Sequence, residues 1–498
     1  MKSDTHTPGV LPPATSSADG GFRFTDTFDG RAWATLIVLC AALFLDALDV
    51  SMIGVALPSI RTGLGISMSS LQWVVSGYVL GYGGFLLLGG RAADLLGRRR
   101  MFLISLAVFL VASGLGGLTD DSLLLIATRF VKGVSAAFTT PAGLSIITTS
   151  FAEGRARNRA LSIYAATGAA GFSLGLVFSG LLTEVSWRWV LFLPVPLALA
   201  TLIAAIRLVP SQPRGPAGTF DLAGAASITS AMLLLVYTVV EAPNVGWGAV
   251  RTLGSLAGVA IILAGFVSIE LRSKAPLVRL GILRSGSLLR ANIGAMSLTG
   301  SWFGFQFIAT LYLQDLRGWS ALETGLAIFP GGLIVVLLAP RVTPRLVERF
   351  GVSPVILAGL VSTAVAYALF LPIGLESNYY TAMLPTFVLG GLGFALAYGP
   401  LNIAATNGIR PDEQGLAGGL VNTSFQFGGA LVLAIVSAVI SANTGSDGSP
   451  GSVLDGYHAA LIVPLIVTAA STSAGAIAIG LLKKPSISPV PQYIGADD

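Results

Sequence analysis

The chain has 498 residues, of which 54% are hydrophobic and only 11% are charged. Roughly a quarter of the residues of a soluble globular protein are charged, so this composition excludes a soluble fold and predicts an all-α polytopic membrane protein. The net charge of +5 does not indicate a nucleic-acid partner, because the basic residues lie in short loops between apolar runs. One cysteine, Cys40, and two histidines, His6 and His458, exclude a disulfide framework and a histidine-rich metal site, and no cofactor is expected.

Apolar runs long enough to cross a bilayer as helices recur along the chain. The polar N-terminus before them has no signal-peptide pattern, and we expect it to be retained, disordered and cytoplasmic. We predict fourteen spans, at 32–58, 70–91, 99–118, 122–150, 156–183, 187–209, 221–241, 250–271, 287–314, 321–341, 352–373, 379–408, 414–443 and 457–482. An even number puts both termini on one side, and the excess of Lys and Arg on that side predicts that it is the cytoplasm.

The stretch Leu45–Pro58 places two carboxylates, Asp46 and Asp49, inside the first apolar run. An acid at the centre of a membrane helix costs about 2.5–3.5 kcal/mol and usually faces a protein-lined cavity or a basic partner. Their spacing of three puts both side chains on one helical face. Capping or snorkelling at a helix end is the alternative, but Asp49 lies well inside the run, which Pro58 and Arg61 are expected to end.

The fourth run contains two basic residues, Arg129 and Lys132, also three apart. A buried arginine needs a partner, and the acids of the first run are the natural candidates. If the two helices touch, we predict that Lys132 neutralises Asp46, which leaves Asp49 and Arg129 as the titrating pair. A purely structural ion pair is the alternative.

The second run ends in a cluster that contains Gly90, Asp94, Gly97, Arg98 and Arg99. A carboxylate, a helix-ending glycine and a basic cluster at the inner membrane edge predict a latch, in which Asp94 meets an arginine or the positive end of a neighbouring helix. A plain positive-inside loop would explain the arginines but not the acid and the glycine at this spacing.

These three stretches carry a resemblance to the major facilitator superfamily. GRAADLLGRR resembles the signature G-x-L-A-D-x-x-G-R-R, with Ala92 at the usual leucine, and RFVKG resembles R-x-x-Q-G, with Lys132 at the glutamine. LDVSMIGVALP resembles L-D-x-T-x-x-N-x-A-L-P, with Ser51 for threonine and Gly54 for asparagine.

The fifth run has small residues at a spacing of four, Gly171, Gly175 and Ser179, which let helices approach closely. The same run resembles the antiporter signature G-P-x-x-G-G, but Leu176 replaces the proline and Ser179 the first paired glycine, so symport stays open. Segments 186–196, 241–248, 310–332 and 401–430 resemble the fourteen-span drug/proton antiporter branch, so the resemblance covers nearly all of 32–482.

The resemblance implies the major facilitator fold, with two six-helix halves and two extra transmembrane helices. The expected organisation is a disordered cytoplasmic N-terminus at 1–31, an N-terminal half at 32–209, the extra helices and linkers at 210–286, a C-terminal half at 287–483 and a cytoplasmic tail at 484–498.

A mostly apolar substrate cavity with few polar groups is expected between the halves. Helix packing is the alternative role for each of its candidate residues, which are Trp302, Phe303, Phe305, Gln306, Tyr398, Asn402, Asn422 and Gln426.

The function that this resemblance implies is proton-coupled efflux of amphipathic or hydrophobic small molecules, with Asp49 as the proton carrier. The expected partners are substrate, protons and the lipid bilayer, and the expected location is the inner membrane of a bacterium, as a monomer. The alternatives are an exporter of an endogenous lipid or metabolite and, from a different class, a non-transporting membrane sensor. An enzyme is not expected, because no nucleophile, base and orienting group cluster in the sequence, and the phosphate-binding loop of an ATP-driven pump is absent.

Overall fold

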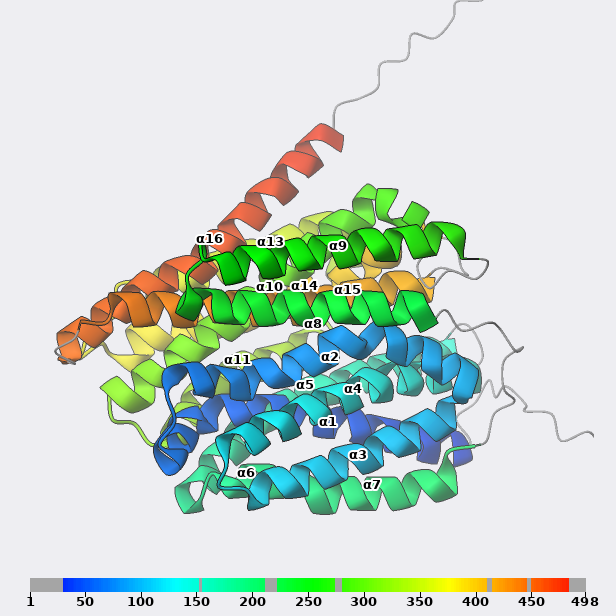
Figure 1. Cartoon of the computed structure of the whole chain (residues 1–498), viewed down its shortest axis with the longest axis horizontal. Coiled ribbons are helices and arrows are strands. Elements are labelled where there is room, and N and C mark those ends of the chain that lie inside the picture. The colour runs from blue at the N-terminus through cyan, green and yellow to red at the C-terminus, as the bar shows by residue number, and fades with distance from the viewer. Residues whose placement is uncertain are drawn as a thin grey trace, which may run out of the picture.

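The computed structural model describes residues 30–151, 155–210, 222–273, 280–409, 414–445 and 449–482. Within these ranges the chain consists of helices and connecting turns, and no strand element is present. The helices lie side by side in one bundle (Figure 1). The predicted all-α fold is therefore confirmed. Residues 1–29 of the predicted N-terminus and the whole of the predicted tail at 484–498 lie outside the described residues.

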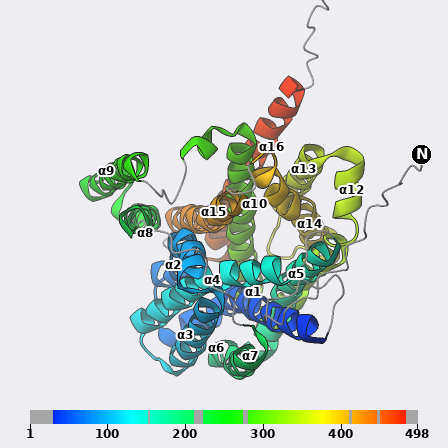
Figure 2. The same cartoon turned by 90° about the vertical axis from the view of Figure 1, so that its right-hand side faces the viewer.

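The first group of helices occupies one side of the bundle (Figure 2). Its members are α1 (Gly30–Leu64), α2 (Met68–Leu96), α3 (Arg98–Leu118), α4 (Ser122–Ser150), α5 (Arg155–Val185), α6 (Arg188–Phe192) and α7 (Pro194–Leu208). Within the group, α1 packs against α5 and α7, and α4 packs against α2 and α3. The predicted sixth span is divided between α6 and α7, because Pro194 and Pro196 have no N–H group to continue the hydrogen-bonding of the first segment.

Two helices, α8 (Leu222–Val245) and α9 (Val250–Arg272), form a pair at the side of the bundle (Figure 2). Helix α8 packs against both α2 and α15, and α9 packs against α8. The indole Nε1 of Trp73 in α2 donates a hydrogen bond to Oε1 of Glu241 in α8 at 2.9 Å. This bond joins the extra pair to the first group.

The second group of helices occupies the opposite side of the bundle (Figure 2). Its members are α10 (Gly286–Leu311), α11 (Ala321–Leu338), α12 (Thr343–Phe350), α13 (Val352–Phe370), α14 (Leu384–Thr406), α15 (Gln414–Asn443) and α16 (Pro450–Leu482), with the short turns η1 (Leu280–Arg284), η2 (Tyr312–Leu316) and η3 (Tyr379–Met383). The two groups meet where α5 packs against α11 and α2 packs against α15. The short helix α12, which the sequence did not predict, lies just beyond the end of α11.

Eleven helical segments within the described ranges are long and apolar enough to cross a membrane. Helices α2, α8 and α10, of 29, 24 and 26 residues, occupy three further runs that were predicted to span. The chain is thus an integral membrane protein by composition and helix length, and the count of fourteen spans stays a prediction.

The small residues of α5 allow a close helix approach, as predicted, and the partner is α1. A Cβ atom on Gly175 would lie 2.0 Å from Oγ of Ser51, and one on Gly171 would lie 2.6 Å from the carbonyl oxygen of Phe44. The hydroxyl of Ser179 donates to the carbonyl of Met52 at 2.6 Å. Backbone-to-backbone packing of this kind holds the helix that carries the two acids in a fixed position.

The first helix does not end at Pro58, contrary to the prediction. It continues through Pro58 and Arg61 to Leu64. Its far end packs in the core, where Leu57 and Ile60 are buried. Tertiary packing therefore compensates for the backbone hydrogen bond that the proline removes.

Candidate functional site

The carboxylate of Asp49 lies in the core of the first group and contacts two cations. Arg129 Nη1 donates to Oδ2 of Asp49, and Lys132 Nζ donates to Oδ1. Asp49 and Lys132 are 0% exposed and Arg129 is 1% exposed. Charges removed from water to this degree persist only when they are paired and hydrogen-bonded.

Helix α4 presents both cations to the same carboxylate because they are three residues apart on one face. Arg129 is further fixed by a hydrogen bond from Nε to the carbonyl of Val74 at 3.2 Å. Its guanidinium also lies over the ring of Tyr78, with Cζ 4.8 Å from the ring centroid. The ammonium of Lys132 lies 4.6 Å from the centroid of the Phe109 ring.

The second acid, Asp46, has a different partner from the predicted one. The hydroxyl of Tyr78 in α2 donates to Oδ1 of Asp46. Lys132 contacts Asp49 instead, so the predicted pair of Asp46 and Lys132 is wrong. Asp49 can bind both cations at once, because each of its two oxygens accepts one donor. The phenol that holds Asp46 was missed by sequence reasoning, although Tyr78 and Tyr82 are spaced at one helical turn.

Glycines set the separation of α2 and α4 at this site. A Cβ atom on Gly133 would lie 2.0 Å from the carbonyl oxygen of Tyr78, and one on Gly81 would lie 2.3 Å from the carbonyl oxygen of Phe130. Gly133 is the last residue of the R-x-x-Q-G resemblance. Its role here is to let α4 lie directly on the backbone of α2, which brings Arg129 onto the ring of Tyr78.

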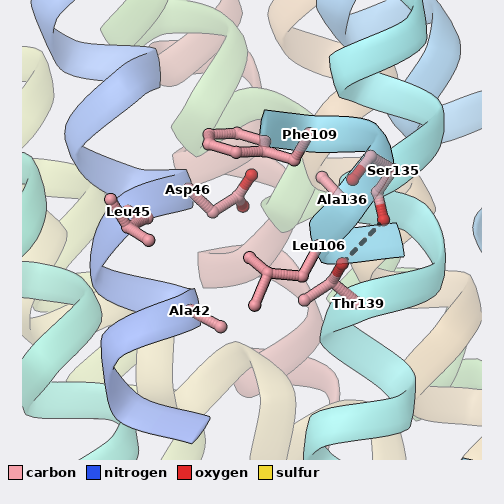
Figure 3. Close-up of a pocket in the computed structure, with 8 residues that line it drawn as sticks. All are labelled: Ala42, Leu45, Asp46, Leu106, Phe109, Ser135, Ala136 and Thr139. Atoms are coloured by element: carbon pink, nitrogen blue, oxygen red, sulfur yellow. Dashed lines mark hydrogen bonds between the residues drawn. The ribbon is translucent and has the colours of Figure 1, made fainter. Parts of the chain in front are cut away.

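A small pocket opens beside Asp46, between α1, α3 and α4 (Figure 3). It has room for about one water molecule. The lining residues are Ala42, Leu45, Asp46, Leu106, Phe109, Ser135, Ala136 and Thr139. Asp46 is the only titratable group among them.

The predicted latch lies at the junction of α2 and α3. Gly90 and Asp94 belong to the last turns of α2, and Gly97 joins the two helices with φ of 98°, a backbone conformation that favours glycine. Arg98 and Arg99 begin α3, and Nη2 of Arg99 donates to the carbonyl of Ile206 in α7 at 2.6 Å. The side chain of Asp94 lies outside the described part of the chain, so its partner stays a prediction.

The predicted cavity residues fall into two sets: those that belong to a row of aromatic rings, and those that pack in the core or bond within their own helices. Trp302 and Tyr398 join a row of aromatic rings that reaches from the first group to the second. The ring centroids are 6.4 Å apart for Phe172 and Trp302, 5.9 Å for Trp302 and Phe394, 5.2 Å for Phe394 and Tyr398, and 4.6 Å for Tyr398 and Phe425. Tyr398 is 39% exposed. Sequence reasoning missed the other three rings, and the only signal was the spacing of four between Phe394 and Tyr398.

Phe305 belongs to the second set and packs in the core, so its role in a cavity stays a prediction. It is 1% exposed, with its ring centroid 4.9 Å from that of Tyr367 and 5.1 Å from that of Phe370. The amide of Asn402 donates to the carbonyl of Tyr398 at 2.9 Å, and that of Asn422 donates to the carbonyl of Gly418 at 2.8 Å. Both amides thus bond to the backbone of their own helices.

Gln306 occupies the space beside Gly54, where the resembled signature has asparagine. A Cβ atom on Gly54 would lie 2.9 Å from Nε2 of Gln306, so a side chain at residue 54 and this glutamine compete for one space. Gln306 is 5% exposed, and its Nε2 has no hydrogen-bond partner among the described residues. Gln426 also meets the first group, with its Cβ 3.4 Å from a Cβ built on Gly83.

Further polar contacts join α1 of the first group to η2, the segment that follows α10 in the second group. Arg61 Nη1 lies 3.2 Å from Oδ2 of Asp315 in η2. Gln314 Nε2 donates to the carbonyl of Val55 at 2.8 Å. Among the described residues, no group of three or more His, Cys, Asp or Glu side chains is arranged to hold a metal ion.

Residues 39–433 match the Major Facilitator Superfamily. The match covers most of the chain and includes all three signature stretches. The chain belongs to the Major Facilitator Superfamily. The predicted family is thereby confirmed, and the buried Asp49 cluster lies within the matched residues.

Three relatives of this major facilitator protein are named for antibiotic export or resistance. The cephamycin export protein CmcT of Amycolatopsis lactamdurans is 37% identical over 438 residues, which cover 86% of this chain and 89% of the relative. The puromycin resistance protein pur8 of Streptomyces alboniger is 36% identical over 441 residues, which cover 86% of each chain. The lincomycin resistance protein of Streptomyces lincolnensis is 33% identical over 423 residues, which cover 84% and 87%.

Solved structures of transporters share the fold. A structure reported for substrate recognition in proton dependent oligopeptide transporters aligns with a TM-score of 0.64 at 15% identity, over 90% of this chain and 98% of the other. The nucleoside transporter NupG aligns with a TM-score of 0.63 at 12% identity, over 89% and 99%. At these identities the likeness concerns the fold alone.

Proposed function

We propose that this protein exports amphipathic or hydrophobic small molecules, such as antibiotics, in exchange for protons. The observation that carries the proposal is the fully buried Asp49, whose two carboxylate oxygens bond to Arg129 and Lys132. The names of the relatives, which refer to cephamycin, puromycin and lincomycin, support the substrate class. Export of an endogenous lipid or metabolite remains the alternative transport function.

In the proposed mechanism, Asp49 alternates between two states. Deprotonated, it holds both cations and keeps α1 tied to α4. A proton on the carboxyl removes its negative charge, so Arg129 and Lys132 lose the attraction that fixes them, and the contact between the helices loosens. Release of the proton restores the bonds, and the cycle needs no covalent chemistry or cofactor.

Alternating access requires two bodies that move against each other. We propose that the halves at 32–209 and 287–483 rock about the contacts of α5 with α11 and of α2 with α15. The row of rings from Phe172 to Phe425 supports a binding surface at this boundary, because aromatic faces offer large apolar contact areas that suit amphipathic substrates.

We place this protein as a monomer in the inner membrane of a bacterium, with both termini in the cytoplasm and no nucleic-acid partner. The excess of basic residues in the loops on the side of the termini supports this orientation. The latch around Asp94 would act at the cytoplasmic edge.

The test uses the purified protein in proteoliposomes with an imposed pH gradient, and a panel of antibiotics screened first in a drug-sensitive host without its own pumps. The unaltered protein should drive efflux of at least one compound, and Asp49→Asn should abolish gradient-driven efflux while the protein still inserts. Full gradient-driven efflux by Asp49→Asn would contradict the proposal. Asp120→Asn is a control for removal of a carboxylate outside the proposed proton site, because its ion pair with Arg188 lies within the first group, and it should retain gradient-driven efflux.

A further inference from the structure

We infer that Asp46 is a second proton-binding site, separate from Asp49, and that the pocket between α1, α3 and α4 holds the water that exchanges a proton with it. The inference rests on the proposed function, because it adds a second proton-binding residue to the same proton-transfer pathway. It departs from the idea that Asp46 merely neutralises a lysine, since the lysine is bound elsewhere.

The two acids differ in what surrounds them. Asp49 is 0% exposed, and both of its oxygens bond to cations. Asp46 is partly exposed, forms no ion pair among the described residues and accepts its hydrogen bond from a neutral phenol, that of Tyr78. An acid without a cation partner in an apolar setting favours its neutral form. Asp46 is therefore the carboxylate that water can reach and that no cation holds in its ionised form.

The pocket walls favour a hydrogen-bond donor. The hydroxyl of Ser135 donates to the carbonyl of Ser105 at 2.6 Å, and that of Thr139 donates to the carbonyl of Ser135 at 2.9 Å. A hydroxyl has a single hydrogen, so both oxygens can now only accept. Figure 3 shows the carboxylate of Asp46 on the opposite side of the pocket from these two residues. A water molecule or a protonated Asp46 supplies the donor that this arrangement lacks.

The pocket is linked to the Asp49 cluster on two sides. Tyr78 joins Asp46 to Arg129, because its hydroxyl bonds to the acid and its ring lies under the guanidinium. Phe109 joins the pocket to Lys132, because one ring lines the pocket and contacts the ammonium. Asp46 precedes Asp49 by three residues, which is about 4.5 Å along the helix axis toward the N-terminal end of α1.

The charged and titratable groups around Asp46 come from four helices. Asp49 lies on its own helix α1, Tyr78 and Tyr82 on α2, Arg129 and Lys132 on α4, and Tyr164 on α5. The pocket residues of α3 are the apolar Leu106 and Phe109. Among these groups, Asp49 bonds to both cations, whereas Asp46 bonds to Tyr78.

The proton transfer conserves charge. The O–H bond on Asp49 breaks as its carboxylate regains Arg129 and Lys132, and the same proton forms an O–H bond on the ionised Asp46 carboxylate. The number of charges in the cluster is unchanged by this step, so no additional charge is left in the low-dielectric interior. Asp46 then gives the proton to the water in the pocket.

Infrared difference spectroscopy of the purified full-length protein tests the inference without a known substrate. Among the protonated-carboxyl bands that the unaltered protein gains as the pH is lowered, one should be lost in Asp46→Asn and a different one in Asp49→Asn. Thr139→Val removes an acceptor from the pocket wall and should shift the Asp46 band. Thr128→Val is the matched control: its hydroxyl also donates to its own helix, to Leu125 at 2.7 Å, but it does not line the pocket, so the spectrum should not change.

The possible outcomes separate the inference from the proposed function. Loss of one band in Asp46→Asn together with a shift in Thr139→Val would support it. A spectrum that Asp46→Asn and Thr139→Val both leave unchanged, while Asp49→Asn abolishes a band and gradient-driven efflux, would overturn the inference and leave the proposed function standing. If Asp49→Asn changed neither the spectrum nor efflux, both would be overturned.

Discussion

A single carboxylate, Asp49, holds two cations because each of its oxygens accepts one donor. The group of three carries a net positive charge while Asp49 is ionised, and Asp46 is the nearby acid that can balance it. Burying these charges is costly, so the arrangement is weak support for stability and stronger support for a site that changes its protonation.

Lys132→Gln should destabilise the protein by about 3 kcal/mol, the lower part of the range for breaking a buried pair from one side, because Arg129 still contacts Asp49. Thermal unfolding of a double-mutant cycle with Asp49→Asn should give a coupling of roughly 1–3 kcal/mol, as expected for residues in contact. The control cycle combines Lys132→Gln with Asp46→Asn and should show a smaller coupling. A larger coupling to Asp46 than to Asp49 would contradict the observed pairing.

Among the elements, α2 and α4 form the contact on which the site depends. Gly133 has the carbonyl of Tyr78 where a Cβ would go, at 2.0 Å. Without this approach, Arg129 would not reach both the ring of Tyr78 and the carboxylate of Asp49. Helix α8 packs against both α2 and α15. It therefore covers the boundary at which α2 of the first group meets α15 of the second.

Gly133→Ala should separate α2 from α4 and lower the yield of folded protein or its transport activity, at a cost of about 1–3 kcal/mol as for other overpacked cores. Gly114→Ala on α3 is the matched control, because nothing lies within 4 Å of a Cβ built there. It should be neutral or slightly stabilising. Detergent-extracted yield and thermal unfolding measure the difference, and equal behaviour of the two variants would show that the close approach is not required.

At the scale of the whole molecule, α1 of the first group is joined to η2 of the second by Arg61 with Asp315 and by Gln314 with Val55. Asp315 follows the predicted span at 287–314. Burial raises the pKa of its carboxyl above the usual 3.8, and the guanidinium of Arg61 opposes this effect.

Asp315→Asn should make stability less dependent on pH. Because the folded protein holds the Asp315 proton to a higher pH than the unfolded chain, its contribution is greatest in acid and is lost as the pH rises through the folded-state pKa. Thermal unfolding between about pH 4 and pH 7 should therefore show a smaller change for Asp315→Asn than for the unaltered protein. Identical pH profiles would mean that this carboxyl does not contribute.

Asp94→Ala should alter the balance between the two states of the transporter. We expect turnover to slow by about tenfold, equivalent to roughly 1.4 kcal/mol, with little change in substrate affinity. Equilibrium binding and turnover, measured separately in proteoliposomes, distinguish a latch from a binding residue. A collapse of binding with normal turnover of bound substrate would place Asp94 in the binding site.

The sequence alone predicted the features that depend on local composition and spacing. Long apolar runs can only be helices in a membrane, because every backbone group must be satisfied internally, and the runs were found as helices. The one-face spacing of Asp46 with Asp49 and of Arg129 with Lys132 located the charged cluster. The small residues of α5 predicted a close helix contact, and the structure shows that the partner is α1.

Only the tertiary structure decided which charges meet. Spacing along a helix places side chains on one face but does not set the rotation and height of that helix against its neighbours. Those are set by the glycine contacts of α2 with α4 and of α1 with α5. They bring both Arg129 and Lys132 to Asp49 and leave Asp46 to Tyr78. For the same reason, no pattern in the sequence distinguished Phe305, which packs in the core, from Tyr398, which is 39% exposed within a row of rings.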